Sequence, residues 1–151
     1  MGRRPRPYPN HARATHLIVA DTSAWVEFLR GTKHEVAITL RQLLERNEDL
    51  AMTEIIIAEL LSGARAGQAT RDLRSRLLSF RLLPLEGLAD FEEAAAIYRA
   101  CTDAGATPRS LSDCLIAVPV IAAGASLLHN DADFDVIARH SLLKVHDARN
   151  R

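Results

Sequence analysis

Acidic side chains stand beside or within apolar sequence at several separate places in this chain of 151 residues. Asp21 ends one apolar run, Glu59 lies inside a second, and Asp113 directly precedes a third. Asp131 and Asp133 follow a fourth run. Ionised carboxylates are rarely buried without a partner, because leaving water costs them free energy. Their placement therefore suggests a site with a chemical purpose.

Carboxylates that face one another need a cation, because like charges at short range raise each other's pKa and destabilise the fold. Mg²⁺, with Mn²⁺ as an alternative, is the natural partner. These ions prefer oxygen ligands, keep several waters and bind through a few carboxylates together with substrate phosphate. A site of this kind activates water for attack on a phosphodiester bond. If the acids converge, they predict metal-dependent nuclease chemistry.

Each acid also has a plain structural interpretation. An aspartate before a helix is commonly an N-cap, so Asp21 alone leaves cap and ligand equally open. Asp131, Asp133 and Asp135 alternate in a segment that reads as a turn, where aspartate is common. Glu59 and Asp113 carry more weight, because apolar neighbours make a poor setting for a solvated charge.

Short apolar runs alternate along the chain with stretches of helical periodicity. We expect strands at residues 16–20, 50–52, 81–85, 125–129 and 142–145, and helices at 24–30, 35–47, 54–64, 70–80, 88–104, 111–123 and 134–139. This alternation predicts an α/β fold in which helices cover both faces of a parallel sheet. Ligands of such sheets bind beyond the carboxyl ends of the strands, where Asp21 and Asp131 would lie.

The composition favours one globular domain, at residues 17–151, with 48% apolar and 25% charged residues. The longest mostly apolar stretch, residues 115–128, is shorter than the roughly 20 residues of a membrane span. The N-terminus lacks the hydrophobic region of a secretory signal. We therefore expect a cytoplasmic protein without a membrane partner.

The net charge of zero hides an asymmetry along the chain. Residues 1–16 contain four arginines and no acid, which predicts a disordered basic tail. The remaining residues carry 15 basic against 19 acidic side chains, a net charge of −4. A mildly acidic body argues weakly against a nucleic-acid-binding protein of the usual basic type.

Four segments of the chain, in this order, carry a resemblance to a known family: Ile18–Ala24, Ile57–Gly63, Ser112–Ala117 and Leu127–Phe134. With these segments the chain resembles the PIN-domain family and, within it, the VapC toxins of bacterial toxin–antitoxin pairs. The resemblance spans roughly residues 17–145. It implies a five-stranded parallel sheet flanked by helices on both faces, and a metal-dependent endoribonuclease.

The resemblance also assigns roles to the acids. It implies catalytic roles for four of them: Asp21, Glu59, Asp113 and Asp131. Three of these, Asp21, Asp113 and Asp131, would be ligands of Mg²⁺ or Mn²⁺, with Asp133 as a further candidate. Whether Asp131 or Asp133 binds the metal directly stays open.

Polar residues beside these acids are candidates for substrate contact. Thr22 or Ser23 would place a hydroxyl near the metal or its water. Arg109 and Ser110 would meet an RNA phosphate at the mouth of the site, although a solvated arginine and a helix cap explain them equally well.

The resemblance further implies partners for the chain. These are an RNA substrate, a second copy of the chain in a homodimer, and a cognate VapB-type antitoxin in a heterotetramer or larger assembly. A C-terminal antitoxin segment would cover the active site and inhibit it. The mildly acidic body suits a basic segment of this kind.

Two other classes of protein compete with this interpretation. One is a phosphate-transfer α/β domain, such as a receiver or a haloacid-dehalogenase-like phosphatase. The phosphatase would have Asp-x-Asp after the first strand, but the residue two positions after Asp21 is Ser23. The other is a PIN-like RNA-binding or adaptor protein without activity, which loss of a site acid would signal. Every expected acid is present.

Overall fold

The computed structural model describes residues 16–64 and 67–148. Its strands are β1 (Ile18–Ala20), β2 (Leu50–Thr53), β3 (Arg81–Leu83), β4 (Ser126–Leu128) and β5 (Lys144–Val145). Its helices are α1 (Thr22–Leu29), α2 (Glu35–Glu45), α3 (Glu54–Gly63), α4 (Gln68–Leu77), α5 (Gly87–Asp103), α6 (Leu111–Ala122) and α7 (Ala132–Arg139). Strands and helices alternate along the chain as the sequence predicts.

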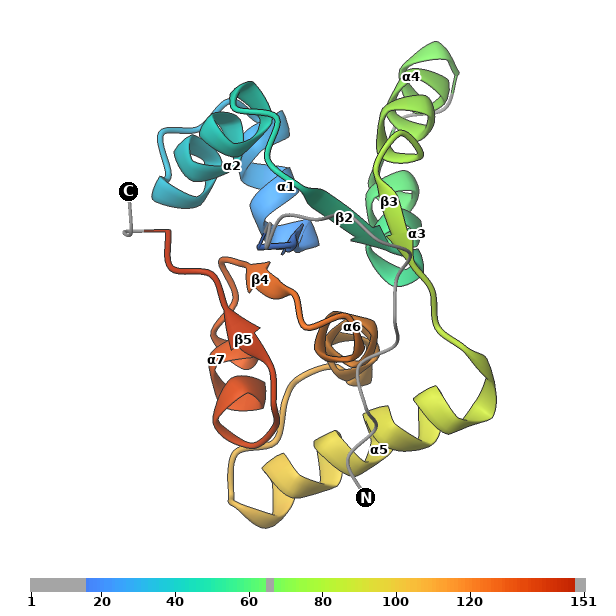
Figure 1. The fold of residues 1–151 in the computed structure, drawn as a ribbon, viewed down its shortest axis with the longest axis vertical. Helices are drawn as coiled ribbons and strands as arrows, with labels where there is room; N and C mark the ends of the chain where they lie inside the picture. Colours follow the sequence, from blue (N-terminus) through green and yellow to red (C-terminus); the bar gives the residue numbers. More distant parts are fainter. Residues whose placement is uncertain (1–15, 65–66, 149–151) are drawn as a thin grey trace.

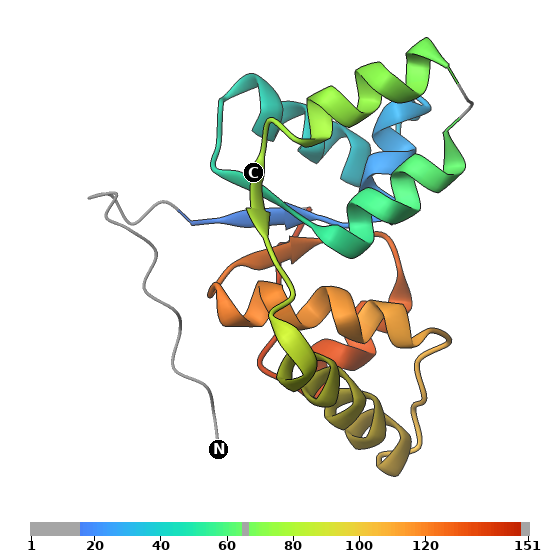
Figure 2. The ribbon, with the colours of Figure 1, turned by 90° about the vertical axis from the view of Figure 1, so that its right-hand side faces the viewer.

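The described strands form one parallel sheet in the order β3-β2-β1-β4-β5 (Figure 1). Helices α1 to α4 lie on one side of this sheet and α5 to α7 on the other (Figure 2). Right-handed crossovers explain the division, because the chain first runs outward from β1 to β3 and then returns across β1 to β4 and β5. The predicted α/β fold is confirmed.

A large aromatic side chain anchors the core on each side of the sheet. Trp25 of α1 is buried against Phe28, with ring centroids 5.7 Å apart and the rings nearly perpendicular. Phe134 is a buried residue of α7, and this helix lies on the opposite side of the sheet. Every residue of β1, β2 and β4 is buried, which explains why these strands are mostly apolar rather than alternating.

The order of the strands reverses between β1 and β4, and this junction positions the site. The backbone N–H of Asp21 donates to the carbonyl of Leu128 at 2.9 Å, so the carboxyl ends of the two strands are joined. Ligands of open α/β sheets bind at such a switch point. The order also differs from the 2-1-3-4-5 order of receiver domains, so the chain is not a receiver.

The helices that follow β1 and β4 begin two residues earlier than the sequence predicts. Asp21 caps α1 and Asp131 caps α7, each by accepting a hydrogen bond from the N–H two residues ahead. Because each aspartate is a cap, its side chain is fixed at the end of its strand. At the sheet edge, β5 is shorter than expected and both of its residues are exposed.

Most of the predicted tail at residues 1–16 lies outside the described residues. His16 is described, and its Nε2 lies 2.8 Å from Oγ of Ser126. Within the described ranges, no helix combines the length and the apolar character needed to cross a membrane.

Candidate active site

Asp21 is held at the end of β1 by its neighbour Ser23. Its Oδ2 accepts hydrogen bonds from the Ser23 N–H at 3.0 Å and from the Ser23 hydroxyl at 2.7 Å. The same hydroxyl oxygen accepts from the backbone N–H of Asn130 at 2.9 Å. Ser23 therefore links the acid that follows β1 to the loop that follows β4.

Glu59 reaches the same region from α3, whose first turn is capped by Thr53 at the end of β2. Its Oε1 accepts a hydrogen bond of 3.2 Å from the hydroxyl of Thr22. Burial and, second, the negative charge of Asp21 raise the pKa of Glu59. The acid predicted from its apolar surroundings thus lies within electrostatic reach of the acid at the end of β1.

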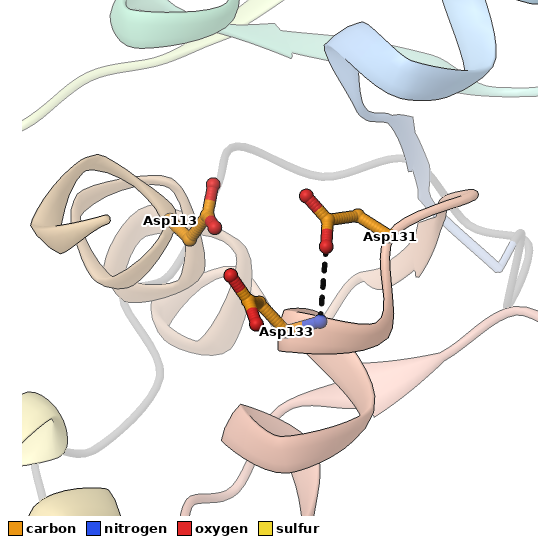
Figure 3. Close-up of side chains that lie close together, drawn as sticks. All are labelled: Asp113, Asp131 and Asp133. Atoms are coloured by element: carbon orange, nitrogen blue, oxygen red, sulfur yellow. Dashed lines mark hydrogen bonds between the residues drawn. The ribbon is translucent and has the colours of Figure 1, made fainter. Parts of the chain in front are cut away.

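Asp113, Asp131 and Asp133 form the closest group of acids in the site. Each offers one carboxylate oxygen, and these three oxygens lie within 4.8 Å of one another. Figure 3 shows the side chain of Asp113, from α6, pointing toward those of Asp131 and Asp133, from the start of α7. Asp131 also accepts a hydrogen bond of 3.0 Å from the N–H of Asp133, which fixes their relative positions.

The acids act on one another electrostatically. Burial first, and then the charges of the other four acids of the site, together raise the pKa of Asp113 to about 7. Burial also raises the pKa of Asp21, although its hydrogen bonds from Ser23 oppose the change. Ionising all five acids is therefore unfavourable unless a cation lies among them.

Arg109, in the loop between α5 and α6, supplies one positive charge to this site. Its Nε lies 3.1 Å from Oδ2 of Asp133, and a terminal nitrogen lies 2.8 Å from Oδ1 of Asp131. The backbone N–H of Arg109 also donates to Oδ2 of Asp133, at 3.0 Å. The side-chain hydrogen bond to Asp133 is the largest of the influences that raise the pKa of the guanidinium. Arg109 thus bridges two acids of the closest group.

The donors present fit a hard divalent cation. Asp113, Asp131 and Asp133 offer oxygen ligands close to a common point, and Mg²⁺ and Mn²⁺ prefer oxygen ligands. The guanidinium of Arg109 shows that a positive charge is already stabilised beside two of them. Asp21 and Glu59 lie near this group without belonging to it.

The fold brings together the site residues predicted from the sequence, but several polar ones contact protein groups. The hydroxyls of Thr22 and Ser23 donate to carboxylates rather than standing free. Ser110 caps α6 by accepting from the N–H of Ser112 at 3.1 Å. These contacts position elements of the site, and direct contact of these residues with RNA stays a prediction.

His129 is a positioning residue that the sequence does not reveal. Its Nδ1 accepts a hydrogen bond of 3.1 Å from the backbone N–H of Asp131, and its side chain is 7% exposed. Its Nε2 lies 3.4 Å from Oδ1 of Asp135. In the sequence, a histidine two residues before an acid is only a weak sign of such a role. The folded loop is needed to show that the histidine ring accepts from the N–H of the acid.

A cavity of about 620 Å³ lies beside the acids and shares Asp131 with them. Its lining includes His34 at the start of α2, Asn130 in the loop after β4, and His146 just after β5. The site therefore has open space next to the carboxylate of Asp131.

The fold and the acids at its switch point define an α/β protein with a carboxylate site suited to a divalent cation. The model of the PIN domain family matches residues 18–140. The chain therefore belongs to the PIN domain family.

Relatives and solved structures agree with this assignment. The chain is 46% identical to "VapC ribonuclease Mb1587" of Mycobacterium bovis over 124 residues, which is 82% of this chain and 92% of that protein. The same values hold for "Ribonuclease VapC11" of Mycobacterium tuberculosis. These proteins therefore share most of the domain with this chain.

Among solved structures, FitAcB from Neisseria gonorrhoeae has the same fold. It superposes with a TM-score of 0.66 at 22% identity, covering 89% of this chain and 99% of that one. VapBC2 from Rickettsia felis, bound to a DNA fragment from its promoter, gives a TM-score of 0.65 at 19% identity, with 86% and 97% covered.

Proposed function

We propose that this chain is a metal-dependent endoribonuclease, the toxin of a VapBC-type toxin–antitoxin pair. One observation carries the proposal: Asp113, Asp131 and Asp133 converge beside Asp21 and Glu59 at the switch point of a PIN fold. The 46% identity to VapC ribonucleases over most of the chain supports the same activity. RNA is therefore the proposed substrate.

In this proposal Asp113, Asp131 and Asp133 hold Mg²⁺, with Mn²⁺ as an alternative, and Asp21 is a further candidate ligand. A bound ion of this kind lowers the pKa of water and neutralises charge on phosphate oxygens. Ser23 keeps the Asp21 carboxylate aimed at the group, through the hydrogen bond of its hydroxyl.

Glu59 would accept the proton of the attacking water. The hydroxyl of Thr22 fixes Oε1 of Glu59, and the raised pKa of the carboxyl brings it closer to the neutral range where general bases work well. Arg109 and Ser110 would bind phosphate at the mouth of the site. The cavity beside Asp131 would take a nucleotide next to the bond that is cut.

We also propose binding partners and a cellular location for the chain. Related solved structures include a toxin–antitoxin complex from Klebsiella pneumoniae, 20% identical with a TM-score of 0.59, and VapBC-1 from nontypeable Haemophilus influenzae, 25% identical with a TM-score of 0.61. We extend this to a homodimer of the chain that binds a VapB-type antitoxin in a heterotetramer or larger complex in the cytoplasm. An acidic site suits a basic antitoxin segment.

The remaining parts of the proposal concern domain limits. Residues 17–151 would form the single PIN domain, and residues 1–16 a basic tail in front of it. The family match at residues 18–140 lies inside the proposed domain.

Controlled expression in a bacterial host tests the toxin role. The wild-type chain should arrest growth at the same time as cellular RNA is degraded. Asp21→Asn, expressed to the same level, should leave growth unchanged. Arrest by both chains alike would contradict a role that depends on catalysis. Arrest without new RNA ends would favour the competing class, a PIN-like protein that binds RNA without cutting it.

A further inference from the structure

We propose that Arg109 is the internal counterion of Asp131 and Asp133 in the metal-free protein, and that a bound divalent cation releases its guanidinium to bind RNA phosphate. The first part of the proposal, release of the guanidinium, involves only the protein and the metal. The second part, binding of the guanidinium to RNA phosphate, rests on the proposed ribonuclease function.

The contacts of Arg109 fall on two acids of the group that would hold the metal. Its guanidinium approaches Asp131 and Asp133 at 2.8 and 3.1 Å. Oxygens of the same two residues, with one of Asp113, lie within 4.8 Å of one another. A divalent cation at that point would share its ligands with the arginine and would repel it at short range. The metal ion and the guanidinium therefore cannot both keep their full contacts with the carboxylates.

Release of the side chain is inexpensive. The Arg109 side chain is 76% exposed, and ion pairs at exposed positions contribute little to stability because water screens them. The backbone N–H of Arg109 makes its own hydrogen bond to Asp133, so the loop has an anchor that does not involve the guanidinium. The side chain can therefore move while its Cα stays at the mouth of the site.

A phosphate is the natural destination of the released guanidinium. Its planar fork of N–H donors matches two oxygens of one phosphate. Among the described lysines and arginines, it is Arg109 that forms ion pairs with the acids of the site. Once the metal neutralises the carboxylates, a positive charge at the mouth attracts RNA instead of its own acids.

Coupling of this kind is reciprocal. If Mg²⁺ frees Arg109 for RNA, Mg²⁺ strengthens RNA binding, and RNA strengthens Mg²⁺ binding by the same factor. Without the arginine both effects shrink. Arg109 would thus oppose metal binding when RNA is absent and support it when RNA is present.

Nuclear magnetic resonance of the arginine Nε–H groups during a titration with Mg²⁺ tests the release directly. The signal of Arg109, identified by its loss in Arg109→Gln, should move to the position of a solvated arginine as Mg²⁺ saturates the site. The signal of Arg81, which pairs with Asp49 at 3.5 Å away from the acids of the site, is the internal control and should stay unchanged. An Arg109 signal that stays in place at saturation would overturn the proposal.

Calorimetry with Mg²⁺ alone supplies a second readout. Arg109→Gln should bind Mg²⁺ about two- to fivefold more tightly than the wild type, because a competing cation is gone. Arg81→Gln, the matched control, should bind as the wild type does. Equal or weaker affinity in Arg109→Gln would also overturn the release.

RNA binding tests the second part. In a Glu59→Gln background, which should not cut RNA but should still bind the metal, Mg²⁺ should strengthen the binding of a labelled single-stranded RNA. The added Arg109→Gln change should remove most of that gain. An equal gain in both proteins would overturn phosphate binding by Arg109. The first two measurements use no RNA. An Arg109 signal that does not shift in protein that binds Mg²⁺ therefore refutes the release without contradicting the ribonuclease function. Normal release in a protein that cuts no RNA refutes only the function.

Discussion

The hydroxyl of Ser23 donates a hydrogen bond of 2.7 Å to Oδ2 of Asp21, and its oxygen accepts from the N–H of Asn130 at 2.9 Å. Two segments more than a hundred residues apart in the chain meet through this one oxygen. Asp21 is buried, so its direction is set by protein contacts rather than by water. The position of this acid toward Asp131 and Asp133 therefore depends on Ser23.

Ser23→Ala should lower RNA cleavage about 10- to 100-fold, the usual effect of losing a residue that orients a metal-binding or catalytic group. The backbone N–H of residue 23 still donates to Asp21, which caps α1, so the fold should persist in this variant. Cleavage rates and thermal unfolding measure the two effects. Ser79→Ala is the matched control, because Ser79 is exposed and bonds only the carbonyl of Arg76 in the described contacts. Equal activity of Ser23→Ala and the control would contradict the positioning role.

Asp113→Asn should abolish cleavage and raise the stability of the metal-free protein at neutral pH. The pKa of Asp113 is raised from 3.8 to about 7 by burial first and then by neighbouring acids. Ionising this carboxyl therefore costs more in the folded than in the unfolded chain. The stability of the wild type should fall as pH rises from about 4 to about 7 and level off above that range.

The amide has no such titration, so the stability of Asp113→Asn should fall less over the same pH range. Since water still screens part of the Asp113 carboxyl, the gain above pH 7 should be on the order of 1 kcal/mol, or about 2–4 °C in Tm. Melting curves in EDTA from pH 4.5 to 8 measure it. Asp103→Asn, at the exposed end of α5, should follow the wild type. A steeper loss of stability in Asp113→Asn would show that the acid stabilises the fold.

Glu59→Gln should separate catalysis from metal binding. Glu59 lies outside the group formed by Asp113, Asp131 and Asp133, so the variant should lose about 10²-fold or more in cleavage while still binding the metal. Saturation with Mn²⁺ at about 100 times Kd should raise Tm by about 5–10 °C in the wild type and in Glu59→Gln. Asp131→Asn should show a much smaller rise. Loss of the Mn²⁺ effect in Glu59→Gln would place this acid among the ligands.

The acids of the site could be predicted because their sequence surroundings are unusual. Glu59 and Asp113 stand among apolar residues, where a carboxylate is costly, and Asp21 ends a buried strand. The parallel sheet followed from the alternation of apolar runs and helical stretches. Together these features predict from the sequence that the acids can meet at one edge of the sheet.

The contacts of Arg109 could not be predicted in the same way. Its guanidinium meets Asp131 and Asp133 only because the loop before α6 and the start of α7 come together in the fold, 22 and 24 residues apart along the chain. Sequence alone offered phosphate contact or a solvated surface position. The role of His129 was hidden for a similar reason, because a backbone N–H as partner leaves no trace in residue types.

The most direct test of the account is cleavage of a cellular RNA pool by the purified chain, free of antitoxin, with Mg²⁺, with Mn²⁺ and with EDTA. Asp21→Asn and Asp103→Asn are prepared in parallel. We expect discrete cuts with either metal, none in EDTA, none from Asp21→Asn, and wild-type cuts from Asp103→Asn. Cuts of equal strength in EDTA, or from Asp21→Asn, would contradict a ribonuclease that works through metal-binding carboxylates at the switch point of the sheet.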